Sequence, residues 1–489
     1  MADDEIKNVQ SIPDENVSHV LGIRGFKFPI VSINAYTFLE SEIKRLELSN
    51  NGFLPQITLI VEVCTPTFRL KHIPHSGDLI SVFIRADSNV FKDINCDFFI
   101  TSFETYTKNN DNEGVAHTFV FYGVLNIPNF YFETTEEYLG LTSYDVLEKI
   151  ASKIGLGFVS NEDTMDDAMN WICASNSLSN FLQKDIALHA YKDDNSFFRL
   201  WIDCFYNLTL CNVGKILLVP DDLELRISVL KQNGLYSTDR FYSEAKDFHS
   251  EFKLLVTNLS SFINSNMYFN KFDILNNSGR IESIFGFKTK TMFYDELLSY
   301  NKSEEDENSK FEMQNVELMA LKKSGAEKDK ITMLGRVGDD SWKNAYKKYN
   351  SGIITNLDNL HPMYNIAKFQ NVINNFEIEK MSAILYMPQI NLNLYKGMLL
   401  QVIFAMSENP TGTNLAGNKD DNFEAAGFVV DRSLSGNWFV SGVTYTYTHN
   451  TMNDFDSSLD KGKWEQSIKI SKREFTMPEV AKYKQSNRV

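Results

Sequence analysis

The chain lacks the residue patterns by which many enzymes and metal proteins are recognised. Five of its 489 residues are cysteines, and no two of them form a C-x-x-C pair. An odd count without close pairs is untypical of a disulfide framework, and it indicates folding in a reducing compartment. The sequence also contains no G-x-S-x-G, no H-E-x-x-H and no phosphate loop. It therefore offers no motif for a nucleophilic serine, a zinc protease or a nucleotide hydrolase.

Long apolar runs and an excess of basic residues are missing as well. No segment approaches the ~18 apolar residues that span a bilayer, and the nearest, 398–406, is interrupted by Gln401. Residues 1–5 are acidic and lack the basic n-region of a signal peptide. The formal net charge of −16 opposes affinity for a nucleic-acid backbone, because such binding needs Lys and Arg to replace counterions. We expect no stable membrane association and no specific binding of DNA.

Aromatic and apolar residues, in contrast, are plentiful. The chain has 37 Phe and 21 Tyr, and 43% of its residues are hydrophobic. That composition argues against general disorder and favours strands. A chain of this length predicts roughly three to four domains.

One strand pair occurs twice in similar form. The first copy comprises 77–84 and 97–103, and the second comprises 397–404 and 437–443. In each copy a glycine precedes an apolar strand, a polar loop follows, and a short polar residue begins an aromatic-rich strand. The repeat predicts two copies of one β-domain joined by unrelated segments. Two similar domains per subunit would allow a trimer to imitate a six-fold ring.

Helices are predicted in the middle of the chain. Thr142 with Asp145 forms a capping pattern, apolar residues then recur at helical spacing, and Gly155 is placed to end the helix. A second helical stretch is predicted within 164–189, with Trp171 among its apolar members, and a third over 363–376. These helices predict small α/β modules beside the β-domains.

The predicted fold class is therefore mainly β (α+β), with two tube-like antiparallel β-barrel domains related by internal duplication and small α/β modules inserted. The predicted divisions begin with a flexible arm (1–17) and a first barrel (18–135). An α/β module (136–245) follows, with helices near 143–155 and 164–189, and its later strands are candidates to complete the first barrel. The remaining divisions are a second barrel (246–300 with 381–475), a mixed insert (301–380) and a tail (476–489).

The candidate sites for chemistry are weak. His72 and His75 could join Cys64 and Cys96 in a zinc site, but their spacing matches no standard ligand pattern, and turn histidines with buried thiols explain them better. Cys204 and Cys211 are likewise better explained as core residues than as a metal or disulfide pair. The remaining candidates are carboxylate-rich turns, a glycine turn and aromatic residues: 193–195, 418–422, 335–340, Trp438, Phe439, Tyr445 and Tyr447.

None of those remaining candidates has the pattern its chemistry needs. The two carboxylate-rich turns lack the regular oxygen-ligand offsets of a calcium loop, and 335–340 lacks the Gly-Lys-Ser/Thr ending of a phosphate loop. The four aromatic residues are predicted to be core and interface rather than a sugar platform. We therefore assign no catalytic, cofactor-binding or metal-binding residue and predict no cofactor.

Four passages, in their order, resemble the central baseplate hub proteins of tailed phages. This family includes the hub of contractile tails, the late-control protein D proteins and the front half of the type VI secretion spike proteins. The passages are 76–82 with 97–101, 144–158, Trp171 with 178–190 and 195–203, and 436–445 with 468–475. No repetitive β-helix and no lysozyme domain follows them, so the resemblance does not imply lytic activity.

The resemblance implies a structural role in the virion, in a tail baseplate built from protein made in the host bacterial cytoplasm. Such a hub is a homotrimer that forms a pseudo-six-fold ring between the hexameric tail tube and the trimeric central spike, with a channel for genome exit. Its implied partners are itself, tail tube or tube-adaptor proteins and the spike, and further candidates are the tape-measure and baseplate wedge proteins. DNA would pass without specific binding.

Two other functions stay open from the sequence. A tail-associated enzyme that degrades peptidoglycan or glycan would need a carboxylate pair in a cleft, and 301–380 could contain one. A secreted glycan-binding β-protein is disfavoured because no signal peptide is evident. A ring-forming assembly would favour the hub, and a lone monomer would favour the other two.

Overall fold

The computed structural model describes most of the chain except several connecting segments and both ends. The described residues are 26–63, 68, 71–86, 91–110, 114–219, 253–259, 262–263, 265–276, 287–293, 314–320, 361, 363–407, 428–449 and 462–472. The predicted arm, the predicted tail, 335–340 and 418–422 lie outside them. In the part that is described, no helix is long and apolar enough to cross a membrane.

The first set of strands forms the N-terminal half of one large sheet. It comprises β1 (Ile30–Ile33), β2 (Tyr36–Thr37), β3 (Ile43–Asn50), β4 (Gln56–Val63), β5 (Leu79–Ile84), β6 (Ile94–Asn110) and β7 (Gly114–Leu125), with the 3-10 turn η2 (Glu40–Glu42) before β3. Their spatial order is β3-β4-β7-β6-β5-β1-β2. Burial alternates strictly along β4, as expected for a strand with one face on a core.

The second set of strands continues the same sheet. It comprises β13 (Lys253–Thr257), β14 (Lys271–Asn276), β17 (Met381–Met387), β18 (Leu399–Ile403), β21 (Gly436–Thr448) and β22 (Lys463–Lys472). Their spatial order is β14-β17-β22-β21-β18-β13, which repeats the first set in both chain order and pairing. The repeat departs at one strand, because β13 pairs β18 in parallel whereas β1 pairs β5 antiparallel. Two separate hairpins join β15 (Phe287–Phe293) to β16 (Gln314–Ala320) and β19 (Ala405–Ser407) to β20 (Phe428–Val430).

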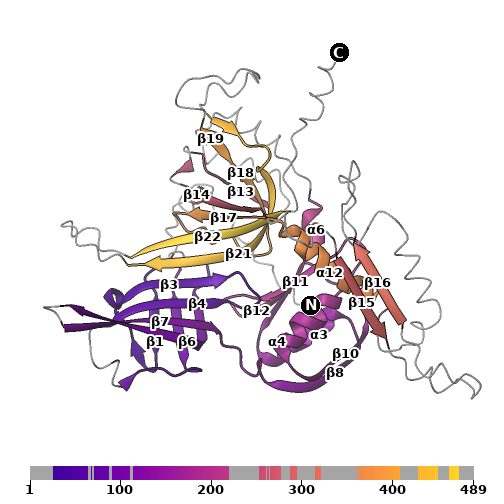
Figure 1. Cartoon of the computed structure of the whole chain (residues 1–489), viewed down its shortest axis with the longest axis horizontal. Helices are drawn as coiled ribbons and strands as arrows, with labels where there is room; N and C mark the ends of the chain where they lie inside the picture. The colour runs from indigo at the N-terminus through magenta and orange to yellow at the C-terminus, as the bar shows by residue number, and fades with distance from the viewer. Residues whose placement is uncertain are drawn as a thin grey trace, which may run out of the picture.

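The two sets meet where β21 pairs β3, so the sheet is continuous across them. In Figure 1 the first set lies below the second, and β21 runs directly above β3. The protein is mainly β with a large antiparallel sheet, as predicted. The pairings among the described strands leave both sets open, so they do not close a barrel in the single chain.

A third part of mixed structure lies beside the sheet (Figure 1). It comprises β8 (Glu133–Leu141), α3 (Ser143–Ile154), β9 (Gly157–Ser160), β10 (Met169–Ser177), α4 (Leu178–Asn180), the π-helix η3 (Phe181–Ile186), α5 (Ala187–His189), β11 (Phe198–Ile202), β12 (Asn207–Asn212) and α6 (Val213–Leu217). A later helix, α12 (Tyr364–Ile378), packs against α5 and β11. We call the elements from β8 to α6 the α/β part.

The helix predicted near 143–155 has the ends that its sequence indicates. The Oγ1 atom of Thr142 accepts from the backbone N–H of Asp145, whose carboxylate accepts in turn from the N–H of Thr142. Gly155 ends the helix with a φ of 77°, a conformation that costs a glycine little. The third predicted helix, over 363–376, is α12.

The prediction of helix throughout 164–189 is wrong for its first half. Met169–Ser177 forms β10, which pairs antiparallel with β8. Burial alternates there, since Trp171 and Cys173 are buried while Ile172 between them is 55% exposed. Pairing with β8 outweighs the helical spacing of the apolar residues. The helix begins only at Leu178, capped by the Ser177 hydroxyl.

Two main apolar cores support these parts. One extends from the first strand set into the α/β part and includes Phe121, Leu147 and Trp171. The other lies under the second strand set and includes Trp438. A smaller cluster joins Trp201, Ile378 and Phe439, so it connects the α/β part, α12 and β21. The three parts are thus held together by packed side chains.

Candidate functional site

The two strand sets meet at the junction between β21 and β3, which we call the seam. Residues 443–448 pair antiparallel with residues 45–50, from Val443 opposite Asn50 to Thr448 opposite Arg45. The other edge of β21 pairs β22, and its N-terminal end pairs β18. One 13-residue strand therefore belongs to the second set at its start and joins the first set at its end.

Aromatic side chains pack along the seam. The ring of Tyr445 meets that of Phe26 edge to face at 5.2 Å, and the ring of Tyr447 lies 5.3 Å from that of Trp464. The indole Nε1 of Trp464 donates to the carbonyl oxygen of Lys27 at 3.0 Å. Burial raises the pKa of the Tyr445 and Tyr447 hydroxyls. Both strand sets therefore share one desolvated aromatic cluster.

Polar contacts fix the relative position of the two strand sets. The amide of Asn51 donates to the Oγ1 atom of Thr444 at 3.0 Å. Lys396, just before β18, donates from Nζ to the carbonyl oxygen of Gly52. Its ammonium also lies 5.1 Å from the centroid of the Trp201 ring, in cation–π geometry. Lys396 thus contacts the first strand set and the α/β part at once.

The environment of Lys396 is unusual for a lysine. The side chain is buried, and burial, with a smaller contribution from Arg199, lowers its pKa to about 7. The adjacent Gly397 has a φ of +95°, and a Cβ there would come within 2.6 Å of Cη2 of Trp201. A side chain at residue 397 would therefore collide with the Trp201 ring of β11, so only glycine fits at this position.

The same glycine turn occurs in both strand sets. The N–H of Gly77 donates to the carbonyl oxygen of Ile100, and the N–H of Gly397 donates to that of Val440, both at 2.9 Å. The N–H of Ile100 then donates to Asp78 and that of Val440 to Met398, again at 2.9 Å. The φ angle is +94° at Gly77 and +95° at Gly397.

The strands that follow these turns also share a register. Leu79 lies opposite Phe99 in the first set, and Leu399 lies opposite Phe439 in the second. A bulge then shifts β6 against β7 just after Ile100, and another shifts β21 against β22 just after Val440. Turn, register and bulge therefore fall at corresponding residues of the two sets.

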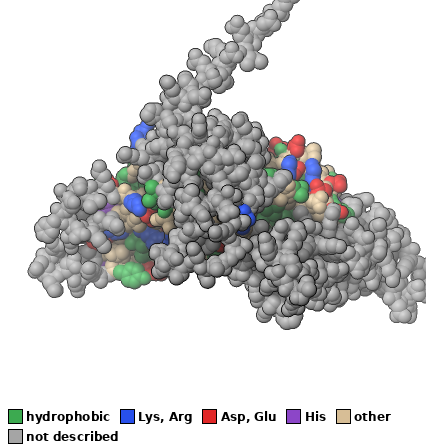
Figure 2. All heavy atoms as spheres, turned by 90° about the horizontal axis from the view of Figure 1, so that it is seen from above, with side chains coloured by type: hydrophobic (Ala, Val, Ile, Leu, Met, Phe, Trp, Pro, Cys, Tyr) green, Lys and Arg blue, Asp and Glu red, His purple; other side chains and the backbone are tan. Residues whose placement is uncertain are grey.

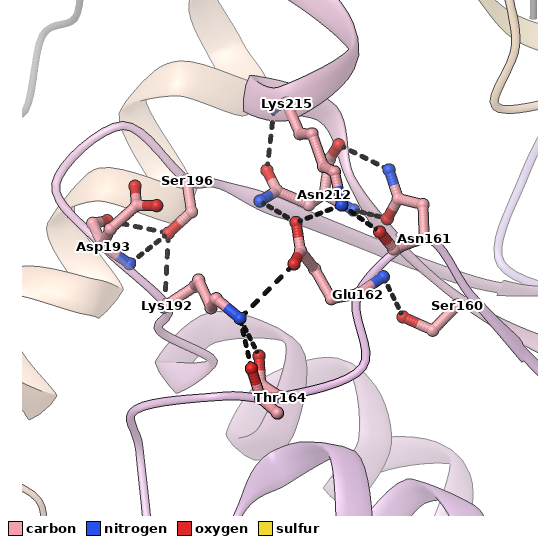
Figure 3. A network of polar contacts seen from close by, with 9 residues as sticks. All are labelled: Ser160, Asn161, Glu162, Thr164, Lys192, Asp193, Ser196, Asn212 and Lys215. Atoms are coloured by element: carbon pink, nitrogen blue, oxygen red, sulfur yellow. Dashed lines mark hydrogen bonds and ion pairs between the residues drawn. The ribbon is translucent and has the colours of Figure 1, made fainter.

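A polar network fixes the α/β part internally (Figure 3). The carboxylate of Glu162 accepts from Asn212 Nδ2 at 3.0 Å and lies 3.5 Å from Lys192 Nζ and 3.4 Å from Lys215 Nζ. Asn161 accepts from the N–H of Asn212 at 2.7 Å. Each member is paired, so the network connects the ends of β9 and β12 with the turn at 192.

Helix α12 is held on the α/β part by its amide side chains. Asn371 accepts from the N–H of Phe198 at 2.8 Å and donates to the carbonyl oxygens of Leu188 and Ala190. Arg199 donates to Asn375 at 2.7 Å. A helix separated from β11 by more than 160 residues of chain thereby completes the core beside Phe439.

Two buried histidines lie beside α12. The ring of His189 stacks on that of Tyr364 with centroids 3.8 Å apart, and His361 Nε2 contacts the carbonyl oxygen of His189 at 3.0 Å. Burial lowers the pKa of each histidine to about 4. Both rings are therefore neutral at physiological pH.

The structure separates most of the sequence candidates for chemistry. His72 contacts the carbonyl oxygen of Asn34, and His75 lies 3.8 Å from Asp78. Cys96 is buried and donates to the carbonyl oxygen of Cys204. Among the described residues, no group of three or more His, Cys, Asp or Glu side chains could hold a metal ion, and Cys64 lies outside them.

The other candidates have structural positions. Cys211 is buried in the cluster with Trp201. At the turn 193–195, the N–H of Asn195 donates to the carboxylate of Asp193, as in an ordinary Asx turn. Trp438, Phe439 and Tyr447 are buried and Tyr445 is partly buried, in agreement with their predicted role in cores and contacts.

Sequence reasoning missed Lys396 and Asp167. Asp167 is fully buried, accepts from the N–H groups of Ser143 and Tyr191 at 2.9 Å, and burial raises its pKa to about 6. It lies in an acidic stretch that is typical of a surface loop. Lys396 precedes a recognised turn, but only the three-dimensional contacts reveal that it is buried.

Comparisons with known proteins give structural matches only. No protein-family model matches the chain, and no curated protein matches it. The tail protein from Neisseria meningitidis MC58 is 9% identical with a TM-score of 0.44, over 92% of this chain and 97% of that one. The 43 kDa tail protein of prophage MuSo2 from Shewanella oneidensis is 7% identical with a TM-score of 0.46, over 91% and 98%.

A third match is the half-lidded PdpA–VgrG complex of Francisella, at 10% identity and a TM-score of 0.37, over 96% of this chain and 62% of the other. Structural matches to tail proteins and to a VgrG complex thus extend over most of the chain. These are the classes named by the sequence resemblance. Because the TM-scores are below 0.5, this likeness assigns no function by itself.

Proposed function

We propose that the protein is the structural hub of a phage tail baseplate. Three copies form a ring in which the two strand sets of each copy occupy alternating, nearly equivalent positions. One face of the ring meets the hexameric tail tube or its adaptor, and the other meets the trimeric central spike. The channel along the axis passes the genome, and no residue has a catalytic role.

The observation that carries this proposal is the equivalence of the two strand sets. They share chain order, pairing order, a glycine turn with the same hydrogen bonds, and a bulge at the corresponding residue. Internal duplication of one β-domain accounts for all of these features. Among the corresponding pairs of described strands, β13–β18 is parallel where β1–β5 is antiparallel, and the bulge between Ile43 and Arg45 in β3–β4 is absent from β14–β17.

A duplicated subunit has a specific use in symmetry matching. A trimer of two-domain subunits presents six similar surfaces on one face while it keeps three-fold symmetry on the other. That arrangement fits a component between a six-fold tube and a three-fold spike. The four sequence passages that resemble baseplate hubs point to the same role.

The surface charge is compatible with a passive channel. The formal net charge is −16, and the described side chains on the face in Figure 2 include both acidic and basic groups. Binding of DNA would require Lys and Arg contacts that release counterions. We propose that DNA passes through the channel without specific binding, and that the tape-measure protein and the baseplate wedge proteins are further partners of this hub.

Light scattering on the purified chain tests the proposal. A mass of three chains supports the hub, whereas a monomer at high protein concentration contradicts it. Zymography against peptidoglycan tests the alternative of a glycan-degrading enzyme. The hub proposal expects no clearing, and a cleared band that disappears when one carboxylate is replaced would overturn the non-catalytic role.

A further inference from the structure

Two of the strand edges that lack a pairing strand in the described part of the chain belong to β6 and β14. β7 covers one edge of β6 from Phe98 to Asn110, whereas β5 covers the opposite edge only from Ile94 to Phe99. β14 pairs β17 on one side and no other described strand on the other. Unpaired edges are ready to accept a further strand, and natural proteins usually block or cover them.

The seam within the chain is a template for what these edges can bind. Matching turns and bulges make β21 the counterpart of β6, with Val443 corresponding to Phe103. The pairing with the next strands makes β3 the counterpart of β14. In the first set, Ile57 of β4 lies opposite Leu48 of β3 and Gly123 of β7. In the second set, Ala383 of β17 lies opposite Ile274 of β14 and Ile470 of β22.

This correspondence gives the register in which the free edges of β6 and β14 would pair. In the seam, 443–448 pairs with 45–50. The corresponding segments are 103–108 of β6 and 271–276 of β14, and the latter is the whole of β14. Each segment corresponds to a strand that is paired in the seam, but its own edge has no pairing strand among the described residues.

We propose that β6 of one copy pairs antiparallel with β14 of a second copy of this chain, in the register of the seam. This pairing rests on the proposed trimer. Phe103 then opposes Asn276, Thr105 opposes Ile274, and Tyr106 opposes Asp273. The contact joins unlike surfaces, so it is heterologous, and three such contacts close a ring. Each strand set then has the same neighbours around the axis.

Burial at these edges fits a missing partner. Leu46 and Leu48 are buried in the seam, whereas their counterparts Phe272 and Ile274 are only partly buried. Leu275 on the free edge strand is 49% exposed. Pairing with a second copy would cover apolar surface that the single chain leaves in water.

Polar groups on the other face are also complementary. Tyr106 is 56% exposed, and its hydroxyl donates to Glu104 of its own strand. On β14, Lys271 lies 3.2 Å from Asp273. In the proposed register Tyr106 lies across from Asp273 with Lys271 diagonal to it. Glu104 thus keeps the Tyr106 hydroxyl as its donor and Asp273 keeps Lys271 when the two edges pair.

Disulfide trapping tests this register directly. The double variant Tyr106→Cys with Asp273→Cys, made with Cys64→Ala, places two thiols opposite each other between copies. Within one chain seven strand spacings separate β6 from β14; at about 4.8 Å each they exclude an internal bond. The matched control is Thr105→Cys with Asp273→Cys, which puts the thiols on opposite faces of the sheet.

The expected result is a reducible ladder on a denaturing gel that ends at three chains for the first pair and is absent for the control. A second pair, Glu104→Cys with Leu275→Cys, gives the same ladder if the first variant fails to fold. A folded trimer that forms neither bond overturns the register but leaves the trimer standing. A folded monomer contradicts both the register and the proposed function.

Discussion

The Nζ atom of Lys396 donates a hydrogen bond to the carbonyl oxygen of Gly52, across the junction of the two strand sets. A lysine in this position joins β18 to the loop between β3 and β4. It also lies over Trp201 of the α/β part. One buried amine, on a residue of the second strand set, therefore contacts both other parts of the molecule.

The stability of the folded chain should depend on the protonation of Lys396. Its pKa is about 7 in the fold, against 10.5 for the unperturbed group, because of burial and the nearby charges of Arg199 and Lys469, with Glu379 acting in the opposite direction. Between these two values the unfolded chain binds more protons, so stability should rise with pH. We expect wild type to gain stability relative to Lys396→Met from pH 7 to 10.5. Parallel thermal-unfolding profiles would contradict this.

The two glycine turns allow a controlled test of the close packing at Trp201. Gly77 and Gly397 have nearly the same φ, but a Cβ meets no atom within 4 Å at Gly77 and comes within 2.6 Å of Trp201 at Gly397. Gly77→Ala should cost about 1–2 kcal/mol for the backbone conformation. Gly397→Ala should cost about 1–3 kcal/mol more for the overpacking. Equal losses in thermal or denaturant unfolding would show that this contact is unimportant.

Acid should weaken the attachment of α12. His189 and His361 have pKa values of about 4 in the fold, against 6.5 for the free side chain. Between pH 6.5 and 4 the unfolded chain binds more protons, so stability should fall as the pH falls. We expect His361→Gln to show a shallower loss over this range in thermal unfolding. Protection factors for hydrogen exchange along α12 that are no lower at pH 4.5 than at neutral pH would contradict the prediction.

The axial channel of the assembled ring should be acidic or neutral. The chain carries 64 acidic and 48 basic residues, and contacts from Lys or Arg to phosphate would retain DNA that has to leave quickly. The measurement is the charge of the side chains lining the axis in a structure of the trimer. A lumen dominated by Lys and Arg would refute this prediction without refuting the hub.

Local signals predicted much of the fold. Thr142, Asp145 and Gly155 identified α3, because capping depends on neighbouring residues. The repeated strand pair was found because a glycine turn and aromatic strands recur at 77–103 and 397–443, and the structure pairs them in one register. In contrast, Trp171 was assigned to a helix because its pairing with β8 depends on residues about 30 positions away.

The seam itself could not be predicted from the sequence. Residues 443–448 read as an ordinary strand, and nothing local indicates that their partner is 45–50, nearly 400 residues earlier. The burial of Lys396 was missed for the same reason, since it is created by Gly52 and Trp201 from two distant segments. Contacts between distant segments are decided by packing rather than by local propensity.

In the proposed hub, three copies place six nearly equivalent strand sets around one axis. Electron cryomicroscopy of the purified chain, viewed along that axis, tests it most directly. We expect a ring of three subunits with six similar β lobes around an open channel. A ring of another subunit number, or three subunits whose two strand sets occupy unlike positions, would contradict it.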